Sequence, residues 1–184
     1  MSDRHVYGGV FKARFEYVKK MHGEYGFQDL IETMIDNGYS GPKDSEGFKT
    51  AQKYPLEYLL IFLETFYDTH SEREFNRMNR EVAKKKGVVG FLLRWAGNPE
   101  LAVNKAGKYW TKFFDFGRLE GEMMEDKKAR INGYDVSPTP LFCKELNLYF
   151  VGALESTGAD GISIEHSSCV HEGDDHCCWD ITWS

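Results

Sequence analysis

The hydrophobic pattern of the chain changes in character after Asp115. Before this residue, apolar side chains recur every three or four positions, which is typical of helices. After it, two stretches alternate between apolar and polar residues, one stretch has helical spacing, and two more alternate. The sequence therefore predicts an α+β fold, in which an N-terminal helical block precedes β-β-α-β-β and the antiparallel sheet packs on helices.

Local signals set the expected element boundaries. Gly23 separates the first two helical segments, and Asn98 followed by Pro99 is typical of a helix start. Gly158 can end the helix of the second block. The expected helices span residues 9–23, 25–38, 55–70, 71–87, 88–97, 98–115 and 137–159. The expected strands span residues 116–125, 127–136, 160–168 and 177–183.

Composition narrows the class of protein. The 184 residues suffice for one domain, which we expect to span residues 1–184, and 29 acidic against 23 basic residues give a net charge of −6. This balance argues against nucleic acid as a partner. We find no signal-peptide pattern and no apolar run long enough for a membrane span, so we expect a cytoplasmic protein.

Sixteen residues near the C-terminus, IEHSSCVHEGDDHCCW, contain three of the four cysteines and three of the six histidines. In a reducing compartment such residues are free thiols or metal ligands more often than disulfides. Zinc binds thiolate and imidazole groups in closed four-coordinate sites. The candidate ligands are Cys143, Glu165, His166, Cys169, His171, His176, Cys177 and Cys178.

The spacing leaves three interpretations open: a metal site, a redox centre and a polar turn. Cys169 and Cys177 flank a turn that can bring two strand ends together, but Cys177 and Cys178 face opposite sides of a strand. Cys143 lies in an apolar helix, where a free cysteine is commonly part of the core. The absence of a CxxC pair argues against both a classical zinc finger and a redox motif.

The segment SSCVHEGDDHCCWDITW resembles the closing motif of the 4-vinyl-reductase-type domain. YWTKFFDFGRLEGE and LFCKELNLYFVGALESTGADGISIEHSSC resemble a related family of stand-alone bacterial proteins. Both belong to a superfamily shared with haem-nitric-oxide-binding domains and with subunits of the TRAPP vesicle-tethering complex. The resemblance covers most of the chain and is best from Tyr109 onward.

This resemblance implies a structural zinc site in which the ligands are Cys143, His166, Cys169 and Cys177. The family places an acidic residue at the second of these positions. His166 replaces it here, and Glu165 lies beside it, so either residue could be the ligand. His171, His176 and Cys178 are not ligands in this scheme.

The resemblance also implies a function: a small-molecule-binding, sensor-like module that holds a hydrophobic ligand between helices and sheet and signals through a partner protein. The aromatic residues Tyr109, Trp110, Phe113 and Phe114 could line such a pocket, although a core helix shows the same pattern. The haem-binding branch needs a helical axial histidine and a Tyr-x-Ser-x-Arg motif, which this chain lacks. His22 and His70 lie at expected helix ends, so the sequence argues that haem is unlikely.

Two further functions compete with a sensor. An enzyme or enzyme accessory could act on a hydrophobic or tetrapyrrole-like substrate. The acidic pair Asp174 and Asp175 beside His176 could then be catalytic, although a polar turn has the same composition. However, the chain has no GxGxxG fingerprint and no P-loop, which argues against an enzyme and leaves it as an alternative. A scaffold that forms a homodimer through its helices is the other alternative. The haem-based gas sensor remains a further variant of the sensor hypothesis.

Overall fold

The computed structural model describes residues 3–84 and 98–184 and divides the chain into two compact units. The first unit contains the residues up to Met78 together with Phe113–Asp115, and the second contains Asn79–Lys112 and Phe116–Ser184. The expected helix at residues 88–97 lies outside the described residues. A single domain over residues 1–184 stays a prediction, and each unit is described below by itself.

The first unit is mainly helical. Its elements are β1 (His5–Tyr7), α1 (Gly8–Asp36), β2 (Lys53–Pro55), α2 (Leu56–Thr69) and the first part of α3 (Glu72–Lys84). Gly23 has φ 71° and ψ −176°, so α1 consists of two helical segments that meet at this residue, as the sequence predicts. The interior is rich in phenylalanine, since Phe11, Phe15, Phe27, Phe48, Phe62 and Phe66 are all fully buried.

A small two-stranded sheet in this unit was not expected from the sequence. β1 pairs antiparallel with β2, with Val6 opposite Tyr54, and Val6 also bridges Phe114. Each strand has three residues, which is too short to produce a recognisable alternation of apolar and polar side chains.

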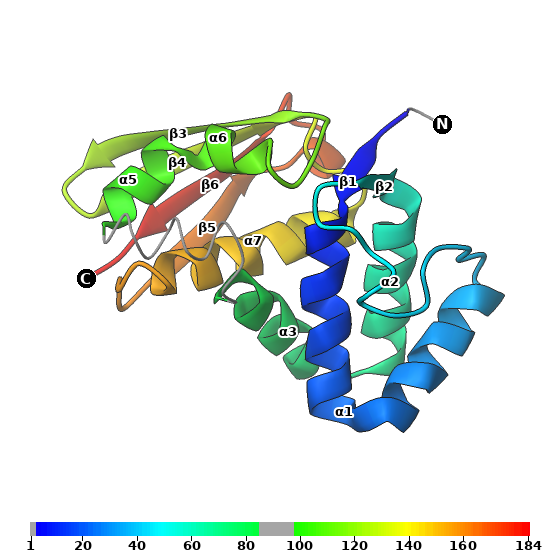
Figure 1. Cartoon of the computed structure of the whole chain (residues 1–184). Helices are drawn as coiled ribbons and strands as arrows, with labels where there is room; N and C mark the ends of the chain where they lie inside the picture. Colours follow the sequence, from blue (N-terminus) through cyan, green and yellow to red (C-terminus); the bar gives the residue numbers. More distant parts are fainter. Residues whose placement is uncertain (1–2, 85–97) are drawn as a thin grey trace. The chain divides into compact units, whose positions relative to one another are not determined.

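The second unit carries a four-stranded antiparallel sheet in the order β3-β4-β6-β5 (Figure 1). Its elements are α5 (Pro99–Asn104), α6 (Ala106–Trp110), β3 (Arg118–Glu125), β4 (Lys128–Tyr134), α7 (Pro140–Glu155), β5 (Ser163–Ser168), the 3-10 turn η1 (Val170–Glu172) and β6 (Cys177–Thr182). The expected α+β class and the β-β-α-β-β order are confirmed.

Helices cover one face of this sheet. α5 lies so close to β3 that a Cβ on Gly121 would overlap the Val103 carbonyl group, and α6 so close that a Cβ on Gly107 would overlap the Leu119 carbonyl group. From α7, the ring of Phe150 packs edge-on against Trp179 of β6, with centroids 5.2 Å apart. On β6, Cys177, Trp179 and Ile181 are fully buried, whereas on the other face Cys178 is buried and Asp180 and Thr182 are more exposed. The alternation seen in the sequence is therefore the difference between the covered and the open face.

The expected helix at residues 98–115 is shorter than predicted and is divided. The Asn98 side chain caps α5 as expected, accepting hydrogen bonds from the amides of Glu100 and Leu101. Lys105 takes non-helical angles (φ −105°, ψ 9°) between α5 and α6. After Trp110 the chain leaves the helix, because Phe113 and Phe114 are used in pairing with β1. Apolar spacing alone cannot reveal this change of partner.

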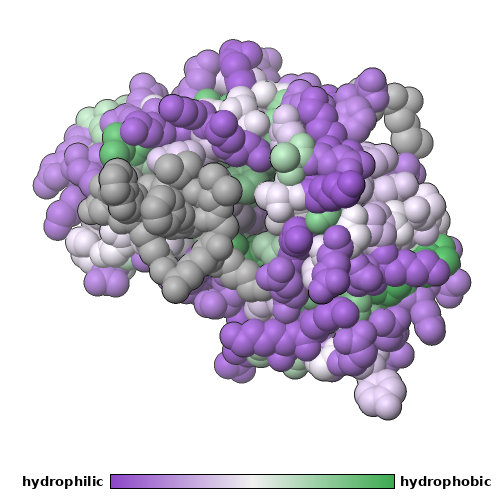
Figure 2. Space-filling model, viewed as in Figure 1, coloured by the Kyte–Doolittle hydropathy of each residue, from purple (hydrophilic) through white to green (hydrophobic). Residues whose placement is uncertain are grey.

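None of the described helices combines the length and the apolar character that crossing a bilayer requires. On the side of the molecule drawn in Figure 2, most visible residues are hydrophilic, and hydrophobic residues form small, separate patches.

Candidate metal centre

The turn between β5 and β6 brings two cysteines together. Cys169 begins the turn, and its carbonyl accepts the amides of Glu172 at 2.9 Å and Asp174 at 3.2 Å. The Asp174 carboxylate accepts the Cys169 amide in return, at 2.7 Å. Gly173 has φ 100°, a conformation that favours glycine, and lets the chain reverse before Cys177. The polar residues of this segment therefore shape a turn that places both cysteines at the same end of the sheet.

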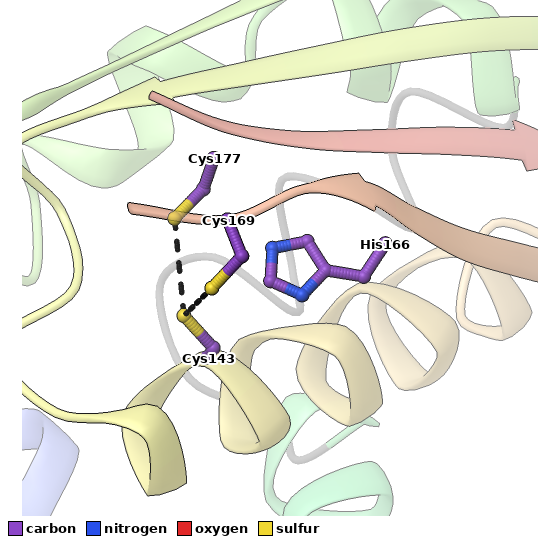
Figure 3. Close-up of side chains that lie close together, drawn as sticks. All are labelled: Cys143, His166, Cys169 and Cys177. Carbon is purple, nitrogen blue, oxygen red and sulfur yellow. Dashed lines mark hydrogen bonds between the residues drawn. The ribbon is translucent and has the colours of Figure 1, made fainter. Parts of the chain in front are cut away.

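The third cysteine comes from the start of α7. Thr139 precedes this helix and caps it, because its hydroxyl accepts the Phe142 amide at 3.2 Å. Pro140 follows as the first helical residue. Cys143 lies one turn into the helix, and its side chain points toward the two strand ends (Figure 3).

The four side chains that the resemblance implies lie together. We call Cys143, His166, Cys169 and Cys177 the Cys3His cluster; their potential ligand atoms all lie within 4.8 Å of one another. The Cys143 sulfur is 3.8 Å from the sulfur of Cys169 and 3.8 Å from that of Cys177. Zinc bound tetrahedrally by sulfur would separate its ligand sulfurs by about 3.8 Å, given zinc–sulfur bonds of about 2.3 Å.

The choice between Glu165 and His166 follows from the alternation of β5. His166 lies opposite Trp179 on the covered face, and its ring stacks on the indole with centroids 4.9 Å apart. Glu165 lies opposite Asp180 on the open face and is exposed. Burial lowers the pKa of His166, which favours the neutral imidazole that metals bind. The geometry thus places His166, and not Glu165, with the three thiols.

Burial also affects the thiols. It raises the pKa of Cys143, although the Ser137 hydroxyl, which can donate to the thiolate form, lowers it in part, and it raises the pKa of Cys177. Without a metal these groups are therefore neutral thiols at ordinary pH. A metal ion would displace their protons and compensate the buried negative charge.

The remaining candidates lie outside the cluster. Cys178 is buried and follows Cys177 on β6, with its side chain on the opposite face. His176 stacks on Tyr134 at 4.8 Å. His171 is exposed and contacts Ser137. Asp174 accepts the Cys169 amide within the turn, so at least this member of the Asp174–Asp175 pair has a structural role.

The predicted pocket residues are divided between the two units. Tyr109 and Trp110 belong to α6 in the second unit, where Trp110 donates its indole N–H to the Phe116 carbonyl at 2.6 Å. Phe113 and Phe114 belong to the first unit. Trp110 and Phe114 are buried, and Tyr109 and Phe113 are partly exposed. Their role in binding a ligand stays a prediction.

No protein-family model matches the chain, and no curated protein matches it. Solved structures do. The chain has the fold of H-NOX proteins. An H-NOX domain from Shewanella oneidensis, a point mutant with CO on Fe(II), matches with a TM-score of 0.71 and 14% identity over 97% of this chain and 98% of that one.

Two further structures agree. An Fe(II) H-NOX protein from S. oneidensis matches with a TM-score of 0.65 and 16% identity, covering 97% of this chain and 96% of that one. An unliganded Fe(II) H-NOX protein from K. algicida gives 0.63 and 14%, again over 97% and 96%. Identities this low show a common fold.

Two sequence-based expectations change with this result. The superfamily named from the sequence resemblance includes haem-nitric-oxide-binding domains, and H-NOX proteins are solved structures that share this fold, but no match supports the 4-vinyl-reductase type in particular. The expectation that haem is unlikely is wrong, because the structures with this fold are haem-binding H-NOX proteins and make haem a plausible cofactor. The absence of a Tyr-x-Ser-x-Arg motif was too little evidence to argue against haem, because that motif is only a small part of the fold.

Proposed function

We propose that the chain is a small-molecule-sensing module of the H-NOX fold that passes its signal to a partner protein. The observation that carries this proposal is the match to H-NOX structures over 97% of the chain. Some of those structures hold NO or CO on Fe(II), so a haem with a diatomic gas is the ligand class to test first. A haem iron supplies the coordination position at which such a gas binds.

The fit of haem depends on an axial donor. Among the α-helices that the structure describes, only α1 carries a histidine within its bounds, His22. Its Nε2 atom lies 3.2 Å from a carboxylate oxygen of Glu74. Metal-binding histidines commonly have a carboxylate partner of this kind on the ring nitrogen that does not bind the metal. His22 would therefore serve as a ligand through its Nδ1 atom, with the Glu74 carboxylate beside its Nε2 atom.

His70 is the second candidate. Its ring lies 4.6 Å from that of His22 and stacks on the Phe66 ring with centroids 4.1 Å apart, so both histidines pack against neighbouring rings. The other histidines have different surroundings: His5 binds Asp115, His166 is in the Cys3His cluster, and His171 and His176 flank the turn. Within the described residues, the fit of haem rests on His22 and His70.

The experiment is a titration of the purified protein with haem, followed by reduction and exposure to CO. We expect one haem per chain and a Soret band that shifts when CO binds. His22→Ala and His70→Ala should identify the axial ligand, because one of them should lose the ferrous band of the parent. His176→Ala is the matched control and should leave the spectrum unchanged.

A parent protein that takes up no haem while keeping its fold would reject the haem proposal. Native mass spectrometry of protein from its host would then test the wider proposal of a hydrophobic ligand. A chain that carries no small molecule in either experiment would reject the sensing module itself.

We further propose that the Cys3His cluster binds a structural metal ion, with zinc as the best fit. The sulfur–sulfur distances of 3.8 Å support this, since they match a tetrahedral thiolate site. Three thiols and a neutral imidazole are also the donors that zinc prefers. With four protein ligands the site has no open position for a substrate, so its role is to fasten α7 to the β5–β6 turn.

Elemental analysis of protein purified without chelators tests this proposal. We expect one zinc per chain, released together with the appearance of three titratable thiols. Protein that holds no stoichiometric metal, and whose cysteines all react freely, would reject the metal site without affecting the haem proposal.

A further inference from the structure

A serine and a histidine that are not ligands lie against the Cys3His cluster. The Ser137 hydroxyl oxygen is 2.9 Å from the Cys143 sulfur, and the same oxygen is 3.1 Å from Nε2 of His171. We propose that Ser137, oriented by His171, donates a hydrogen bond to the Cys143 thiolate when the cluster holds a metal ion. Ser137 is then a positioning residue for the metal site, and this inference rests on the metal site proposed above.

The sequence pattern did not reveal Ser137, because the segment from Ser137 was interpreted as part of the helix. The two prolines in Ser137-Pro138-Thr139-Pro140 are the available signal, since a residue before proline avoids helical angles. The non-helical lead-in to α7 turns the Ser137 side chain back toward Cys143, six residues later.

The hydrogen atoms around Ser137 can be assigned in the metal-free state. Its hydroxyl donates to the carbonyl of Thr139 at 2.9 Å. A hydroxyl has one hydrogen to donate and two lone pairs, so the contacts with Cys143 and His171 are both accepted by Ser137. The thiol S–H and the His171 Nε2–H are the two donors. The Ser137 hydroxyl then uses its one hydrogen and both of its lone pairs.

Metal binding reverses the direction of the hydrogen bond between Ser137 and Cys143. The Cys143 thiol loses its proton to solvent, and its sulfur can from then on only accept hydrogen bonds. The Ser137 hydroxyl therefore has to turn from the Thr139 carbonyl to the sulfur. The carbonyl remains satisfied, because it also accepts the amides of Phe142 at 3.1 Å and Cys143 at 3.3 Å.

His171 makes the turned hydroxyl a better donor. Its Nε2–H keeps donating to the Ser137 oxygen in both states, and a hydroxyl that accepts one hydrogen bond donates the next one more strongly. Partners of this kind around metal ligands typically change metal affinity by about 10- to 100-fold when they are removed. The turn between β5 and β6 thus contributes an outer partner as well as two ligands.

The test compares zinc affinity, measured by competition with a chelator, in the full chain and its variants. Ser137→Ala should weaken zinc binding by about 10- to 100-fold, and Ser137→Thr, which keeps the hydroxyl, should stay within about threefold of the parent. His171→Ala should give a smaller loss than Ser137→Ala. Ser167→Ala is the matched control, because the Ser167 hydroxyl bonds the Cys178 carbonyl away from the cluster.

A spectroscopic readout separates the hydrogen bond from a general loss of structure. In the cobalt-substituted protein, loss of a donor to the thiolate should move the sulfur-to-cobalt charge-transfer band to lower energy. We expect this shift in Ser137→Ala and not in Ser137→Thr. Parent-like affinity and band position in Ser137→Ala would overturn the inference, whereas a parent chain that binds neither metal would overturn the metal site itself.

Discussion

Cys177 and Cys178 are neighbours on β6 with opposite surroundings, which makes them a matched pair for testing the cluster. Both are buried, but only Cys177 has its sulfur 3.8 Å from that of Cys143. Replacing either residue with alanine removes one buried side-chain atom. That loss costs about 1 kcal/mol of unfolding free energy, by analogy with other single-atom deletions in cores.

The two variants should differ only when metal is present. With free zinc at about 1,000 times its dissociation constant, binding stabilises the folded parent by about 4 kcal/mol. For a chain of this length, that corresponds to an increase in Tm of about 8–16 °C. Cys178→Ala should keep this increase because its four ligands remain, and Cys177→Ala should lose most of it.

Thermal melts of the parent and both variants, with zinc and with chelator, measure the difference. In chelator, both variants should melt about 2–4 °C below the parent. With zinc, only Cys177→Ala should fail to gain stability. Equal gains in the two variants would show that Cys177 is not a ligand, and an absence of any gain in the parent would show that the cluster holds no zinc.

Three further predictions address other parts of the structure. His166→Ala should weaken zinc binding strongly and Glu165→Ala should not, as measured by chelator competition, because only His166 faces the thiols; the reverse order would contradict the register of β5. Gly121→Ala should destabilise the second unit by about 1–3 kcal/mol in denaturant unfolding, since its Cβ would overlap the Val103 carbonyl; a neutral effect would contradict the close approach of α5 to β3. Burial alone would raise the pKa of Asp115, but bonds from Lys53 and the His5 amide outweigh it and lower that pKa, so the stability that Asp115 contributes is present above about pH 3.9 and is lost as pH falls below it. Lys53→Met should reduce this loss in acid unfolding curves, and an unchanged acid limb would show that Lys53 does not set it.

The sequence predicted those features that depend on local chemistry. Gly23 divides α1 because only a residue without a side chain adopts its angles readily, and Asn98 caps α5 because its side chain accepts two amides. The alternation of β6 correctly predicted which residues share a face, although Cys178, opposite the covered face, is buried as well. The segment around Gly173 was expected to return the chain toward Cys177, and it does so.

Features that depend on distant partners could not be predicted in the same way. The strands β1 and β2 exist because residues about 50 positions apart pair with each other, and the helix after Asn98 ends where Phe113 and Phe114 meet β1. The selection of His166 over Glu165 required the register of β5 against β6. The sequence argued against haem because the similarity to H-NOX structures lies in the backbone fold. At 11–16% identity, this similarity cannot be recognised from short motifs.

Native mass spectrometry of the full chain, before and after incubation with haem, tests the proposed sensing function most directly. The account predicts a species that carries one metal ion and one non-covalently bound small molecule, with haem accepted at one equivalent and released on denaturation. A chain that keeps its metal ion but binds no small molecule under either condition would contradict the sensing function and leave a metal-stabilised H-NOX fold with a different role.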